Sequence, residues 1–323
     1  MTFNQIYTNL LQECWDQPIT TNERTGAKVK QIFGVNFKLN PTTDFPLTTL
    51  RPVPIKAGWL SEVIWFLIGT DKMDFLNQNK NKFWNEFLDN NGNCPYNYGA
   101  IWQNSFGRNQ MDSLLNSLQN EPSSRQNVIT IWNGSKDGLD SPKQANVPCI
   151  TQFQVSISNN KLYLHTYWRS EDLGLGFVND VPAFAMLQMF LAQKLGLEVG
   201  ELIWTIHNAH IYENQFENVK EMIYRHNELE QDIGYLILPY DNKEEMVEYY
   251  YTRYNCLYNI EAFNIINFNP ISFSLNELPA HCFDICYQQP NLDKAQIVLA
   301  EIFGIIKSKY NPLAKLAKME IVK

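Results

Sequence analysis

Four features of this sequence combine reactive groups with unusual settings. Cys149 follows Asn-Val-Pro at a turn before a strand-like run, where a nucleophilic thiol could be exposed, although such a cysteine is more often a buried apolar residue. Arg169 directly ends an apolar run, where an unpaired charge is costly, so a phosphate or carboxylate partner is expected. Glu62 interrupts an apolar helical stripe and needs a partner or a proton-transfer role. The segment 169–180, RSEDLGLGFVND, ends on an amide and a carboxylate, Asn179 and Asp180, and only one of them need face a ligand.

Other polar residues give weaker signals. Arg24 and Arg125 lie in loops, where most arginines face water. The cluster HCFDIC at 281–286 has no common zinc spacing, and the six cysteines form no repeated close pairs, so we expect reduced thiols and no metal.

Composition narrows the class of protein. The chain has 323 residues, of which 45% are hydrophobic, enough for one large core. Its net charge of −8 and pI near 5.2 argue against a duplex nucleic-acid partner, which would require a basic face. No export signal or membrane-length apolar run is evident, so we expect a cytoplasmic protein that does not contact membranes.

The elements that must position these residues form a mixed pattern. Helical spacing is seen at 3–11, 60–67, 182–195 and 295–307, the third beginning just after Asp180. Strands are expected at 29–39, with a glycine bulge at Gly34, and at 128–132, 151–157, 161–168 and 202–206. Residues 158–160 read as a hairpin turn. Without strict alternation, the pattern predicts an α+β fold in one domain spanning 1–323.

Taken together, ordered segments of the chain resemble the thymidylate synthase family. The matching segments are NERTGAKVKQIFG, DFPLTT, SEVIWFLIGTD, WNEFLDNNGNCPYNYG, NVPC followed by QF, RSEDLGLG, HNAHIY and the tail YNPLAKLAKMEIVK. The resemblance implies that family's fold: a large mixed sheet packed with helices, with one sheet face forming a homodimer interface. Residues 213–300 match least clearly and could hold insertions.

The resemblance also implies a reaction and roles. A one-carbon unit passes from 5,10-methylenetetrahydrofolate, a co-substrate, to carbon 5 of a pyrimidine nucleoside monophosphate through a cysteine adduct at carbon 6. The positions that match catalytic residues are Cys149, Glu62, Tyr98 and the base-reading residue. Those that match nucleotide ligands are Arg24, Arg169, Ser170, His210, Tyr212, and Arg125 from the partner subunit. Those that match the folate pocket are Trp84, Asp172, Gly176, Ile321 and Val322.

The base-reading position decides the substrate. The family has asparagine eleven residues after the phosphate arginine, and here that position is Asp180. Asparagine suits uracil, whereas a carboxyl group can accept from the cytosine amine and share a proton with nitrogen 3. The segment GFVND and Tyr-Asn-Tyr-Gly at 96–99 therefore resemble the phage deoxycytidylate hydroxymethylases, which implies dCMP and a 5-hydroxymethyl product. A one-residue slip would place Asn179 there and restore dUMP and thymidylate synthesis.

Other departures from the family pattern agree with a changed site without naming its reaction. The usual histidine after the nucleophile is Ile150, and the glutamine before the phosphate arginine is Trp168. The second arginine of the partner pair is Gln126, and the lysine of the TTK segment is Leu50. A third hypothesis is a catalytically silent member that binds nucleotide or messenger RNA.

Overall fold

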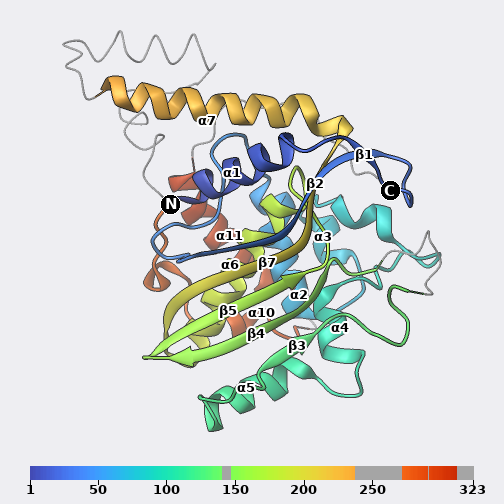
Figure 1. The fold of residues 1–323 in the computed structure, drawn as a ribbon. Coiled ribbons are helices and arrows are strands. Elements are labelled where there is room, and N and C mark those ends of the chain that lie inside the picture. The colour runs from blue at the N-terminus through green and yellow to red at the C-terminus, as the bar shows by residue number, and fades with distance from the viewer. Residues whose placement is uncertain (140–146, 237–270, 290, 311–323) are drawn as a thin grey trace.

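A seven-stranded mixed sheet organises the molecule (Figure 1). The structure, a computed structural model, describes residues 1–139, 147–236, 271–289 and 291–310. The strand order is β1-β2-β7-β5-β4-β3, with β6 paired to β7; β5 and β6 run parallel to β7, and the other pairs are antiparallel. The strands are β1 (Thr20–Thr21), β2 (Lys28–Leu39), β3 (Val128–Thr130), β4 (Ile150–Ser158), β5 (Lys161–Trp168), β6 (Glu171–Asp172) and β7 (Glu198–Tyr212).

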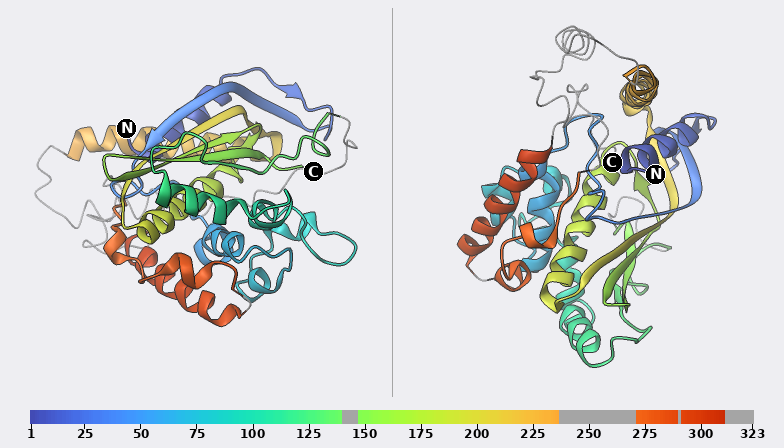
Figure 2. Two further views of the ribbon diagram at one scale, coloured as in Figure 1. Left: turned by 90° about the horizontal axis from the view of Figure 1, so that it is seen from below. Right: turned by 90° about the vertical axis from the view of Figure 1, so that its left-hand side faces the viewer.

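Helices cover one face of this sheet in layers (Figure 2). Helix α6 (Phe177–Leu195) packs between β5 and β7 on one side and α2 (Leu60–Ile68) and α10 (Cys282–Cys286) on the other. The remaining helices are α1 (Phe3–Trp15), η1 (Ile55–Trp59), α3 (Asp74–Gln78), η2 (Phe83–Phe87), α4 (Tyr98–Asn104), α5 (Gln110–Asn120), η3 (Glu213–Gln215), α7 (Phe216–Leu236), η4 (Leu275–Glu277) and α11 (Leu292–Lys309). The expected mixed sheet packed with helices is confirmed.

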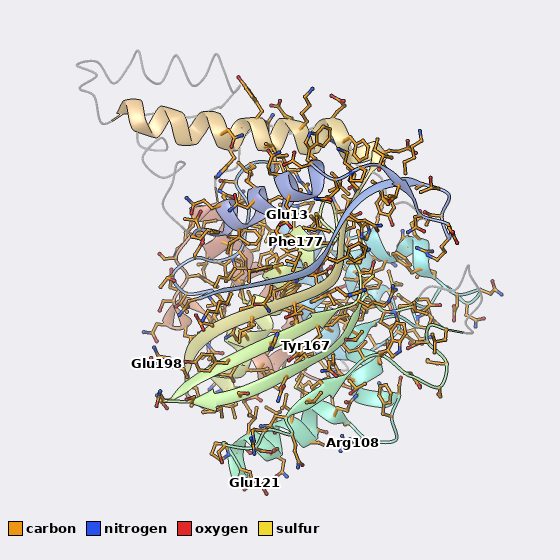
Figure 3. The ribbon with its side chains drawn as sticks, viewed as in Figure 1. Glu13, Arg108, Glu121, Tyr167, Phe177 and Glu198 are labelled. Atoms are coloured by element: carbon orange, nitrogen blue, oxygen red, sulfur yellow. The ribbon has the colours of Figure 1, made fainter. Side chains whose placement is uncertain are left out.

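The other face of the sheet carries no helix from the described ranges. Along β5 the residues alternate: Leu162, Leu164 and Trp168 are buried toward the core, whereas Tyr163 and Tyr167 are half-buried on the outer face. Figure 3 labels Tyr167 on this strand. This outer face is polar and aromatic. Such a surface suits contact with another chain better than contact with the core.

Two predictions about backbone details are wrong. Helix α6 begins at Phe177 and not just after Asp180. The predicted start was placed at Pro182 because proline favours the first turn of a helix. In the structure Pro182 lies inside the helix, five residues after its start. Gly34 has a φ of 75°, yet the β2–β7 register continues unchanged on both sides of it. The glycine absorbs a left-handed backbone without an inserted residue, so it is not a bulge.

The expected turn and thiols agree with the structure. Asn159 and Asn160 both have positive φ, as a tight turn between β4 and β5 requires. The cysteines in the described ranges are all free thiols, and Cys256 lies outside those ranges. No described helix combines the length and apolar character needed to span a bilayer.

Candidate active site

Cys149 lies at the entrance to β4, held by Arg169 from the end of the neighbouring strand. The Arg169 backbone N–H donates to the Cys149 carbonyl at 2.9 Å. Its guanidinium donates from Nε to the Pro148 carbonyl at 2.8 Å and from Nη2 to the Val147 carbonyl at 3.0 Å. An anionic partner was expected for Arg169, but two of its guanidinium N–H donors are used by backbone carbonyl groups. Arg169 therefore shapes the turn that presents the thiol.

The thiol of Cys149 is protonated at neutral pH in the free protein. Burial raises its pKa to about 11, and the cations Arg169 and Arg24 oppose this only in part. Asp180 and Glu171 raise the pKa further through their negative charge. Nucleophilic attack by Cys149 therefore requires that its proton be removed as the ligand binds.

Glu62 is a carboxylate on a helix that is otherwise buried and almost wholly apolar. It is 3% exposed, and Asn81 Nδ2 donates to its Oε1 at 3.0 Å. Burial raises the pKa of Glu62 to about 7, while the contacts with Asn81 and Trp84 lower it. The Trp84 indole N–H faces this carboxyl but falls short of hydrogen-bond geometry. A group with this pKa can both accept and return a proton near neutrality.

Asn179 and Asp180 point to different neighbours from the first turn of α6. Asn179 donates from Nδ2 to the Leu175 carbonyl at 2.8 Å, within its own chain segment. Asp180 instead interacts electrostatically with Cys149 and Tyr98, and its charge raises the pKa of both. Burial, followed by the charge on Glu62, raises the pKa of Asp180 well above its usual range. Asp180 therefore lies near enough to the thiol for its charge to act there, while the Asn179 amide N–H is engaged within its own segment.

Gly176 and Tyr98 set the space around Asp180. A Cβ at Gly176 would lie 3.3 Å from Asp180 Oδ2, tighter than ordinary contact, so the glycine leaves room for the carboxyl group. Tyr98, 6% exposed, meets Trp84 edge-on with 5.7 Å between ring centroids and Trp168 edge-on at 6.4 Å. Of these three rings, Tyr98 is the one whose hydroxyl is influenced by the charge of Cys149, so the aromatic cluster reaches the thiol through Tyr98.

The end of β7 brings His210 and Tyr212 to the same region. His210 is 7% exposed, its Nδ1 lies 3.0 Å from Asn208 Oδ1, and its ring centroid lies 4.9 Å from that of Tyr212. Burial lowers the pKa of His210, and the nearby Asp172 carboxylate raises it. The predicted strand ended at Ile206, but β7 extends to Tyr212 and thereby carries both residues inward.

Asp172 is committed to the turn that precedes α6. Its Oδ1 accepts from the backbone N–H groups of Gly174 at 2.8 Å and Leu175 at 3.2 Å. Gln215 Nε2 donates to both carboxyl oxygens at 2.9 Å. The role seen here is to fix the glycine turn, and a folate contact by Asp172 stays a prediction.

The predicted phosphate ligands do not all lie near Cys149 of the same chain. Arg24 is exposed in the loop after β1, close enough for its charge to lower the pKa of Cys149, and Ser170 directly follows Arg169. Arg125 is exposed, and its carbonyl accepts from Gln154 Nε2 at 3.0 Å. Gln154 is five residues along β4 from Cys149, about 16 Å at the rise of a strand. Arg125 is therefore remote from the thiol of its own chain.

Two predicted folate-pocket residues, Ile321 and Val322, lie outside the described residues. Within the described ranges, no group of three or more potential metal-ligating side chains is present.

Sequence reasoning missed two buried polar residues near this site. Asn81, in a loop, carries no signal that separates it from ordinary loop asparagines. Glu171 is 2% exposed; its Oε2 accepts from Trp204 Nε1 at 2.9 Å, and Oε1 has no hydrogen-bond partner among the described residues. Burial and the charge on Asp180 raise the pKa of Glu171 well above its usual range. The signal that could have revealed Glu171 is its place in RSED, where two acids stand side by side directly after Arg169 and Ser170.

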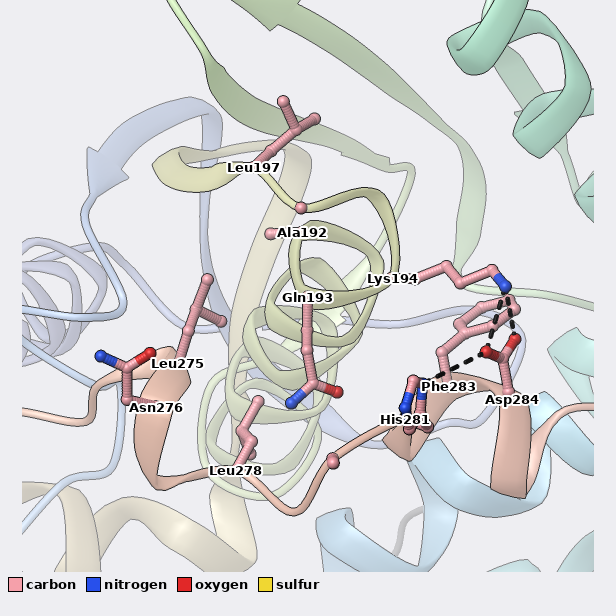
Figure 4. A pocket seen from close by; sticks show the side chains of 12 residues that line it. Ala192, Gln193, Lys194, Leu197, Leu275, Asn276, Leu278, His281, Phe283 and Asp284 are labelled. Carbon is pink, nitrogen blue, oxygen red and sulfur yellow. Dashed lines mark hydrogen bonds and ion pairs between the residues drawn. The ribbon is translucent and has the colours of Figure 1, made fainter.

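A shallow hollow of about 640 Å³ lies at the other end of α6, between that end and the segment from η4 to α10 (Figure 4). Lys194 and Asp284 form an ion pair of 2.8 Å at its edge. From Asp180 to Lys194 is fourteen residues of helix, about 21 Å, so this hollow is separate from the site around Cys149.

Comparison with known proteins agrees with this geometry. A curated protein from Corynebacterium aurimucosum named thymidylate synthase is 33% identical over 269 residues, which cover 82% of this chain and 93% of that protein. This relative does not support the narrower resemblance to deoxycytidylate hydroxymethylases. The sequence profile described as thymidylate synthase matches residues 5–272. The chain belongs to the thymidylate synthase family.

Proposed function

We propose that the protein converts dCMP to 5-hydroxymethyl-dCMP, with 5,10-methylenetetrahydrofolate supplying the one-carbon unit. Cys149 Sγ bonds to carbon 6, which makes carbon 5 nucleophilic toward that unit. Glu62, through water, receives the proton that leaves carbon 5. Cleavage of the bond between this unit and the folate nitrogen releases tetrahydrofolate and leaves an exocyclic methylene at carbon 5. Water adds to this methylene to give the hydroxymethyl group, and elimination of Cys149 frees the product.

The observation that carries the choice of cytosine is the difference between the two neighbouring residues of α6. Asp180 interacts with Cys149 and Tyr98, whereas the Asn179 amide is used by the Leu175 carbonyl. One oxygen of the Asp180 carboxyl accepts from the cytosine amine, and the other shares a proton with ring nitrogen 3. Ile150, fully buried where the family has histidine, removes a polar group from this edge.

Two residues of the described ranges, Trp84 and Tyr98, support a folate pocket beside Glu62. The buried indole N–H of Trp84 lies close enough to Glu62 to lower its pKa, which puts this ring beside the proposed proton acceptor. Trp84 and Tyr98 offer aromatic surface to the ring system. We propose these two residues as the pterin-facing side of the pocket.

Thymidylate synthesis from dUMP is the second candidate, favoured by the name and 93% coverage of the bacterial relative. It is chemically possible at this site, because a protonated Asp180 can donate to uracil oxygen 4 and accept from the nitrogen 3 proton. An ionised Asp180 would instead repel oxygen 4 while still accepting from the cytosine amine. The two substrates thus respond differently to pH.

The two candidates are separated by product mass. Purified protein is incubated with 5,10-methylenetetrahydrofolate and either dCMP or dUMP. The proposal expects 5-hydroxymethyl-dCMP from dCMP without dihydrofolate. Dihydrofolate and dTMP from dUMP, with dCMP inert, would establish the second candidate. Release of tritium from carbon 5 of neither nucleotide would indicate a silent binding protein.

We further propose a homodimer through the outer sheet face. Tyr167 and Tyr163 on this face are half-buried in one chain, and Phe33 is 62% exposed. Arg125 lies too far along β4 to reach its own Cys149. A partner docked on the sheet could bring its Arg125 to the phosphate of this site.

A further inference from the structure

Asn81 is a fully buried amide that connects Glu62 to the turn before α2. Its Nδ2 donates toward Glu62 Oε1 at 3.0 Å, Ser61 Oγ at 3.1 Å and the Gly58 carbonyl at 3.2 Å. Its Oδ1 accepts from the Phe83 backbone N–H at 3.0 Å. With both ends of the amide engaged, the side chain has a single defined orientation.

The amide opposes the forces that keep Glu62 protonated. Burial raises the pKa of Glu62, and the hydrogen bond from Asn81 is the largest effect that lowers it, followed by Trp84. The titratable group that faces Glu62 from α6 is Asp180, and mutual repulsion disfavours two negative charges there. A neutral amide donor stabilises the carboxylate without adding a charge that itself titrates.

We propose that Asn81 is a positioning residue that keeps Glu62 ionised and oriented for transfer of the carbon 5 proton. The inference rests on the role of Glu62 in the proposed function. Because Asn81 holds Oε1, the proton is received at Oε2. The bond to the Gly58 carbonyl also fixes the turn against which Asn179 packs, since a Cβ at Gly58 would lie 3.2 Å from Asn179 Oδ1.

The test compares Asn81→Leu with Asn79→Leu as a matched control. Asn79 is also buried, at 3% exposure, but its Nδ2 donates to the Phe75 carbonyl at 2.8 Å and not to Glu62. Tritium release from carbon 5 of the accepted nucleotide is measured from about pH 5 to 9. For Asn81→Leu, the acid limb of the profile should move up by about one pH unit, roughly a tenfold loss at low pH and little loss at high pH. The control should lower the rate, if at all, equally at every pH.

A second readout does not depend on the reaction. The infrared C=O band of protonated Glu62, identified by its loss in Glu62→Gln, is titrated in the free protein. Its midpoint, expected near 7 in the native protein, should rise in Asn81→Leu and also in Asn81→Ala, a smaller side chain that serves if the leucine variant does not fold.

Acid limbs that coincide between native and Asn81→Leu protein, or an unchanged infrared midpoint, would overturn the inference. If native protein releases no tritium while the midpoint still shifts, the proposed function fails but the coupling of Asn81 to Glu62 stands.

Discussion

Exchange of Asp180 for asparagine is the sharpest test of which base the site accepts. Asp180→Asn replaces the carboxyl group that interacts with Cys149 and Tyr98 by an amide of nearly the same size. The amide donates to uracil oxygen 4 and accepts from its nitrogen 3 proton, whereas cytosine presents the opposite pattern. The variant should therefore gain activity on dUMP and lose it on dCMP.

The size of the effect follows from the two base atoms that change partner. A buried polar group left unsatisfied costs about 1–3 kcal/mol, so two mispaired groups cost about 2–6 kcal/mol. This corresponds to a change of roughly thirty-fold to twenty-thousand-fold in the ratio of kcat/KM for dCMP and dUMP. The ratio of kcat/KM values is the proper measure, because loss of the Asp180 charge also lowers the Cys149 pKa, and that effect on the nucleophile is common to both substrates.

The assay measures both products by mass spectrometry at saturating cofactor, with Asn179→Ala as the control. Asn179 donates to the Leu175 carbonyl, so its loss should reduce stability without altering the substrate ratio. An unchanged ratio in Asp180→Asn, or a reversed ratio in Asn179→Ala, would refute the assignment of Asp180 to the base.

Three further perturbations test other parts of the site. The pKa of Glu62 is about 7 in the folded protein and near 4.5 when unfolded, so the native state binds more protons between these values and its stability falls as pH rises through them. Glu62→Gln should therefore increase the free energy of unfolding by about 3 kcal/mol at pH 8 and by little at pH 5, which Tm measured against pH checks. The same variant should abolish tritium release. The charge of Glu171 raises the pKa of Cys149, so Glu171→Gln should speed the reaction of Cys149 with iodoacetamide, whereas the exposed control Glu121→Gln should leave that rate unchanged. Equal rates in the two variants would contradict the coupling of Glu171 to the thiol. If Arg125 serves the partner's site, two inactive variants, Arg125→Ala and Cys149→Ser, should complement each other when mixed and reassociated. Half of the dimers are then mixed and each has one intact site, so about a quarter of native activity should return. No recovery would contradict a shared site.

Much of the fold could be predicted because its elements have strong local patterns. The β5 run alternates apolar and polar residues, and it forms the predicted strand with those two faces. Helix α2 has continuous apolar residues with one acid, and this alone marked Glu62 for a special role. The start of α6 could not be predicted, because Pro182 gave a local signal that the tertiary packing of Phe177 against Phe3 and Tyr7 overrides.

The sequence proposes candidate site residues but does not give their arrangement in space. The residue types and their order in NVPC, RSED and HNAHIY are fixed by the sequence, so they were enough to identify the family and to predict Cys149 as the nucleophile. Which of Asn179 and Asp180 lies near the thiol depends on where α6 begins, because successive helical residues point about 100° apart. The contact of Asn81 with Glu62 joins residues nineteen apart in the chain. Only the tertiary structure decides such contacts, since they depend on how separate elements pack around a buried charge.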